Sequence, residues 1–88
     1  MNKPISNEEL FLQLVLQNQQ MAMISMGKTQ NPLTQKLEPN LEFAKITIDM
    51  LDMIVEKTKG NLSDYESKLI TEVIRDLKLN YVEATKSK

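Results

Sequence analysis

The chain has 88 residues, a net charge of −1, and neither cysteine nor histidine. This length supports one domain, and the composition excludes disulfides, thiolate zinc sites and the commonest general base. A monomer of this size buries only about 60–65% of the surface that its unfolded chain exposes, so association is the remaining source of added stability. Leu, Met, Gln, Glu and Lys are plentiful and aromatic residues make up only 5%, which favours helix over strand.

A capping box begins the first expected helix, over residues 7–26. The Ser6 oxygen accepts from the third amide of such a helix while Glu9 reaches back, and Gly27 supplies a left-handed stop. This helix is apolar around most of its circumference, and two other helices of one small chain would not easily cover so much apolar surface. We therefore expect it at the centre of a homo-oligomeric bundle, with an interface formed by Leu10, Phe11, Leu14, Val15, Asn18, Met21 and Ile24.

Four consecutive amide side chains, residues 17–20, occur in the middle of this helix. They span most of a helical circumference, so at least one should face inward, where a buried amide sets the register between copies as a lone Asn does in coiled coils. Exposure on the outer face is the alternative.

The expected surroundings follow from charge. Lys3 is followed by Glu8 and Glu9 before any apolar run, so no signal-peptide pattern is present. Residues 10–27 are uncharged, which could suggest a membrane-spanning segment, but their side-chain amides would be costly inside a membrane. They also contain no Lys or Arg to hold a helix on a membrane surface. We expect a soluble, cytoplasmic protein without a membrane partner. Nucleic-acid binding is expected to be weak at most, because only Lys86 and Lys88 form a basic end.

Residues 28–39 contain two prolines and are expected to connect two helices, with Leu33 and Leu37 anchoring them on the body. Extended, they reach about 40 Å, so the first helix can pack on its own chain or on another subunit. Asn40 caps a second helix over residues 41–58.

Gly60 ends the second helix, and a second capping box, Ser63 with Glu66, begins a third over residues 64–83. The joint is so short that the two helices should form a tight αα-hairpin. The predicted fold is therefore a single all-α domain over 1–88 with three helices, and residues 1–5 and 84–88 are expected to be disordered.

With these elements laid out, the chain resembles a bacterial family of short helical proteins, number eighteen-forty-four of the domains of unknown function. The resemblance rests on residues 11–16, the Asn31-Pro32 turn, and the blocks 48–62 and 76–82, and it covers residues 10–83. Residues 57–62 are its most specific part. It implies a short helical fold and supplies no activity.

Two clusters suggest sites. Asp49, Asp52 and Glu56 share one face of the second helix and could hold Mg²⁺ or Ca²⁺, but a solvated face with a Lys45–Asp49 pair is the simpler interpretation. Side-chain donors gather near the first turn of the third helix, whose amides could hold an anion unless Ser63 and Glu66 satisfy them. This gives a candidate partner surface, formed by Lys57, Thr58, Lys59 and Asn61.

The methionines suggest either an adaptable docking groove or core filling. No metal or cofactor is expected, and no enzyme, because no histidine can activate a serine. The predicted function is that of a structural or protein-interaction module, an oligomeric accessory or regulatory protein. Its expected partners are its own copies, in a dimer or higher even assembly, and a second protein. The alternatives are a small-molecule or lipid carrier using the apolar interior of the oligomer, and thirdly a weak nucleic-acid binder.

Overall fold

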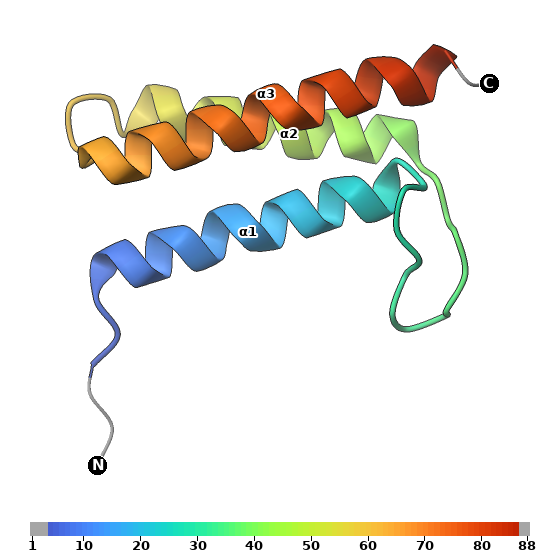
Figure 1. Cartoon of the computed structure of the whole chain (residues 1–88), viewed down its shortest axis with the longest axis horizontal. Coiled ribbons are helices and arrows are strands. Elements are labelled where there is room, and N and C mark those ends of the chain that lie inside the picture. Colours follow the sequence, from blue (N-terminus) through green and yellow to red (C-terminus); the bar gives the residue numbers. More distant parts are fainter. Residues whose placement is uncertain (1–3, 87–88) are drawn as a thin grey trace.

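The computed structural model describes residues 4–86, which form three helices: α1 (Asn7–Ser25), α2 (Leu41–Lys57) and α3 (Asp64–Lys86). α2 and α3 form an antiparallel hairpin, and α1 lies along both, antiparallel to α2 and parallel to α3 (Figure 1). The predicted all-α fold of three helices is confirmed, and the assembly of several copies stays a prediction.

All three helices begin where local capping chemistry places them. The Glu9 amide donates to Ser6 Oγ at 3.1 Å, and the Ser6 amide donates to the Glu9 carboxylate at 3.0 Å. Ser63 and Glu66 repeat this pair of bonds at the start of α3, at 3.1 and 2.9 Å. Asn40 Oδ1 accepts from the Phe43 amide at 3.1 Å. Each helix start therefore satisfies amides that lack an intrahelical partner.

The end of α3 differs from the prediction. The helix continues to Lys86 instead of stopping at residue 83, because Ala84 still packs against the core and holds the added turn. Of the termini predicted to be disordered, residues 1–3 and 87–88 lie outside the part of the chain that the structure describes.

One apolar core joins the three helices, and Leu51 of α2 is among its fully buried residues. Two alanines, Ala22 and Ala44, have no exposed surface and let α1 approach α2 closely. α1 thus packs on the helices of its own chain. The other buried apolar residues are Val15, Met26, Ile48, Ile70, Val73, Ile74 and Leu77.

The connection between α1 and α2 projects past α1 as an ordered loop (Figure 1). Four hydrogen bonds of Asn31 shape this loop. In the backbone, the Asn31 amide donates to the Lys36 carbonyl at 2.8 Å, and the Asn31 carbonyl accepts from the Gln35 amide at 2.6 Å. In the side chain, Oδ1 accepts from the Leu33 amide at 2.9 Å, and Nδ2 donates to the Glu38 carboxylate at 3.0 Å. Leu33 is 92% exposed and Leu37 57%. The prediction that both leucines anchor the loop on the body was wrong, because this network turns the loop outward.

Candidate interaction surface

One side of α1 has no helix of its own chain against it. Leu10, Leu14 and Met21 on that side are exposed by 49, 42 and 46%. Gln17 lies among them and is also exposed, and Ile24 is half-buried. Since these positions recur every three or four residues, they form one stripe along the helix.

A second apolar stripe is exposed on α2. Phe43, Ile46, Met50 and Met53 are exposed by 36 to 54%. They too recur at helical spacing, on the side of α2 away from Asp52, whose carboxylate meets Lys78 of α3 at 3.1 Å. The stripe therefore lies on the side of α2 that faces away from α3.

The two stripes are neighbours. A hollow of about 400 Å³ is lined by Met21 and Ile24 of α1, Phe43 of α2, and Leu33 of the loop, among others. Because α1 and α2 run side by side from that end, the stripes form one surface, called here the α1/α2 face. It comprises Leu10, Leu14, Gln17, Met21, Ile24, Phe43, Ile46, Met50 and Met53.

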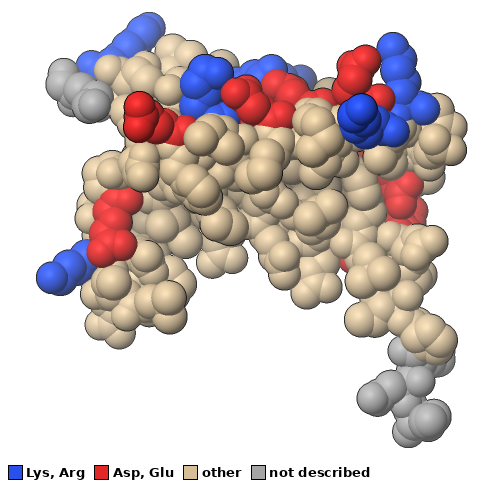
Figure 2. All heavy atoms as spheres, turned by 180° about the vertical axis from the view of Figure 1, so that it is seen from behind, with Lys and Arg blue, Asp and Glu red and all other residues tan. Residues whose placement is uncertain are grey.

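Charge is distributed unevenly around the molecule. Figure 2 shows charged side chains gathered along one edge, over α2 and α3, and a largely uncharged surface below that edge. α1 contributes no charged residue between Glu9 and its end at Ser25. The α1/α2 face is thus both apolar and nearly free of charge.

The seven residues predicted on α1 divide into three groups. Leu10, Leu14 and Met21 are exposed, and Ile24 is half-buried at the edge of the hollow. Phe11 is half-buried against the core, and the half-buried Asn18 donates its amide to the Leu14 carbonyl at 2.9 Å. Val15 is fully buried in the core of its own chain and has no surface to offer a partner.

The exposed stripe of α2 was predicted only through Met50 and Met53, as part of the docking groove that the methionines suggested as one alternative, and Phe43 and Ile46 were missed. The apolar positions of α2 cover more than one stripe, and Phe43, Ile46, Met50 and Met53 fit the helical period as well as the buried Ile48 does. The available signal was the width of this apolar surface, which exceeds the stripe that a surface helix needs.

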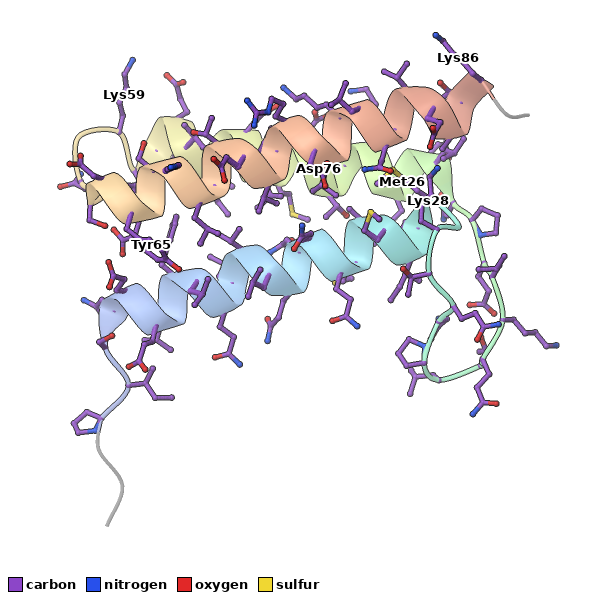
Figure 3. All side chains as sticks on the ribbon, viewed as in Figure 1. Met26, Lys28, Lys59, Tyr65, Asp76 and Lys86 are labelled. Carbon is purple, nitrogen blue, oxygen red and sulfur yellow. The ribbon has the colours of Figure 1, made fainter. Side chains whose placement is uncertain are left out.

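The residues predicted as a partner surface lie at the α2–α3 joint, and their role stays a prediction. Lys57, Lys59 and Asn61 are exposed, and Lys59 points away from the helices (Figure 3). Thr58 follows the last residue of α2, and its hydroxyl donates to the Ile54 carbonyl at 2.6 Å.

The first turn of α3, beside that joint, is already occupied. Ser63 and Glu66 form its capping box, and the Ser63 hydroxyl also donates to the Glu8 carboxylate at 3.3 Å, which ties α3 to the start of α1. An incoming anion would meet two carboxylates there.

Two carboxylates of α2, those of Asp49 and Asp52, are paired with lysines. Asp49 lies 3.0 Å from Lys45, whose pKa is raised by the hydrogen bond and charge of that carboxylate. Asp52 pairs with Lys78. Within residues 4–86, no three acidic, histidine or cysteine side chains are grouped as metal ligands would be.

Comparison with known proteins adds one finding. The model of a family described as Domain of unknown function (DUF1844) matches residues 8–83. The chain belongs to this family. The DUF1844 match spans all but the first residue of α1, all of α2 and most of α3, so both stripes of the α1/α2 face lie inside it. Comparison with curated proteins and with solved structures found no match. None of the helices described in this DUF1844 chain has the length and apolar character needed to cross a membrane.

Proposed function

We propose that this DUF1844 chain is a homo-oligomeric interaction module that assembles through its α1/α2 face. The observation that supports the proposal is the extent of that face. The seven large exposed apolar side chains of the face together present on the order of 600 Å² of accessible surface. This is the upper end of the range for the largest apolar patch on a typical monomer. Each partner in an interface of standard size contributes about 800 Å².

The chemistry of the face favours a partner of the same kind. An uncharged apolar surface is complementary to another uncharged apolar surface, and a second copy of the chain presents one of matching length. A two-fold assembly needs only one self-complementary patch. Burial of each half-exposed Leu or Met adds roughly 2 kcal/mol per chain at about 25 cal/mol per Å².

Sedimentation velocity between about 1 and 100 μM tests the proposal, because association follows mass action. The unmodified chain should sediment above monomer mass. Leu14→Glu should give a folded monomer, since Leu14 is 42% exposed in the single chain and a glutamate there stays solvated. Leu79→Glu is the matched control: Leu79 is 66% exposed on α3 and outside the face, so this variant should assemble normally.

A well-folded monomer of the unmodified chain at 100 μM, with unfolding independent of concentration, would refute the proposal. So would a Leu14→Glu variant that assembles as well as Leu79→Glu.

A carrier role is the second candidate, and the hollow beside Phe43 favours it. Its volume of about 400 Å³ falls within the range of small-molecule sites, about 300–1,000 Å³, and a second copy packed on the α1/α2 face would close it. Native mass spectrometry of the purified assembly decides between the two: a retained non-protein mass supports a carrier, and a bare protein mass opposes it.

A further inference from the structure

The stripe on α1 is centred on Gln17. Leu10 and Ile24 each lie seven residues from it, and Leu14 and Met21 lie three and four residues away. When a second copy of α1 runs antiparallel with the two Gln17 residues opposed, Leu10 comes level with the partner's Ile24. Leu14 comes within one residue of the partner's Met21, an offset of about 1.5 Å. The apolar side chains therefore meet apolar side chains along the whole helix.

The stripe on α2 has its own centre, at the level of Ile48. Phe43 and Met53 lie five residues to either side of that level, and Ile46 and Met50 lie two residues to either side. An antiparallel copy of α2 centred there opposes Phe43 to the partner's Met53, and Ile46 to the partner's Met50.

The fold of one chain places these two centres side by side. The Asn40 amide donates to the Ser25 carbonyl at 2.6 Å, which fixes the end of α1 beside the start of α2. The helices run antiparallel from that bond (Figure 1). Gln17 lies eight residues before Ser25, and Ile48 lies eight residues after Asn40. Since both helices rise by about 1.5 Å per residue, Gln17 and Ile48 are level, and one two-fold axis passes through both centres.

We propose, as a refinement that depends on the proposed self-assembly, that two copies pack their α1/α2 faces together as an antiparallel four-helix bundle. The two-fold axis lies at the level of Gln17 and Ile48. α1 packs on the partner's α1, α2 packs on the partner's α2, and both copies of α3 lie outside. Helices at a small crossing angle with apolar side chains every three or four residues suit this packing.

Gln17 sets the register of this bundle. It is the one amide within a stripe whose other members are Leu, Met and Ile, and on the axis it meets the partner's Gln17. Each amide has donors and an acceptor to offer the other. A shift by one turn would place Gln17 against apolar side chains and leave its buried amide unpaired, which is unfavourable. A single polar residue fixes register in coiled coils in this way.

Charge at the ends of the face agrees with the same register. Lys57 continues the α2 stripe by one further step, and the pairing brings it level with the partner's Pro39. Glu38 precedes that proline and lines the edge of the hollow. The lysine of each copy therefore approaches an acidic residue of the other at both ends of the bundle.

Thiol crosslinking of the full-length chain tests the arrangement, and the absence of native cysteine leaves only the introduced thiol to react. With a short bifunctional maleimide, Gln17→Cys should link to itself. Leu10→Cys should not, because two Leu10 residues lie fourteen residues apart in level, about 21 Å. A mixture of Leu10→Cys with Ile24→Cys should link. Leu79→Cys, on α3, is the unlinked control.

The outcomes separate this inference from the proposed function. A linked Leu10→Cys homodimer overturns the antiparallel arrangement. An assembled protein in which the mixture of Leu10→Cys with Ile24→Cys, which keeps Gln17, stays unlinked overturns the position of the axis. Both leave self-assembly intact. A monomer in sedimentation overturns self-assembly itself. Gln17→Leu tests the register separately: it should still assemble, but in that background the mixture of Leu10→Cys with Ile24→Cys should link less completely, because registers shifted by one turn then compete. An unchanged linking yield counts against Gln17 as the register residue.

Discussion

Two glycines occupy the same backbone region in different surroundings, and alanine at each should separate two costs. Gly27 and Gly60 have φ of 77° and 84°, in the left-handed region as predicted. A side chain at Gly60 would meet no atom within 4 Å. Gly60→Ala therefore meets only the left-handed penalty of about 1–2 kcal/mol, offset by about 0.4–1 kcal/mol from the less flexible unfolded chain. The net loss should be about 1 kcal/mol.

The same change at Gly27 should cost more. An added Cβ would lie 3.2 Å from Cβ of Pro39. Pro39 precedes Asn40, whose amide donates to the Ser25 carbonyl at 2.6 Å, so the proline cannot retreat without loosening that bond, worth about 1 kcal/mol. Gly27→Ala should therefore lose about 2 kcal/mol.

Urea unfolding followed by circular dichroism, at one fixed protein concentration, measures both variants. In thermal unfolding, each kcal/mol should appear as a shift of about 4–8 °C. Gly60→Asn serves as the control, because asparagine tolerates left-handed backbone better than alanine. Equal losses at Gly27 and Gly60 would show that the approach to Pro39 costs nothing, and an unchanged Gly60→Ala would refute the backbone reasoning itself.

Two further predictions concern stability. Leu51→Ala should cost about 2–5 kcal/mol because Leu51 is fully buried, whereas Leu79→Ala should stay within about 0.5 kcal/mol; equal denaturation midpoints would contradict the assigned core. The pKa of Glu9 is lowered by its hydrogen bonds with Ser6, and that of Glu83 by Lys28. A carboxyl group whose pKa is lower in the folded chain stabilises the fold at pH values above its unfolded pKa of about 4.3. That stabilisation is lost as the pH falls through the folded pKa. The free energy of unfolding should thus be nearly constant from about pH 6 to 8.5 and should fall in acid. Glu9→Gln should reduce the acid slope, and an unaltered slope would argue against the capping bond.

The helix starts and stops were predictable because each depends on a few adjacent residues. Ser6 with Glu9, Ser63 with Glu66, and Gly60 act through bonds and backbone angles that neighbours in sequence determine. The exposed side of α1 was also foreseeable, since its apolar positions outnumber those that two neighbouring helices cover.

What the sequence could not determine was which apolar stripe of α2 turns inward. Ile48 and Ile46 are two residues apart with similar side chains, yet one is 4% exposed and the other 54%. The choice depends on where α1 packs along α2. Ala22 and Ala44 are both fully buried, and such small side chains leave room for two helices to pack closely. Leu33 was misplaced for a similar reason, because its exposure follows from the bonds of Asn31 rather than from its own hydrophobicity.

The loop between α1 and α2 depends on the chemical integrity of one amide. Asparagine side chains are lost over time when the backbone nitrogen of the following residue attacks the side-chain carbonyl and closes a succinimide ring. In this loop the following residue is Pro32, whose nitrogen carries no hydrogen and cannot close that ring. Asn31 can therefore keep its two side-chain bonds, to Glu38 and to the Leu33 amide, without this route of ageing.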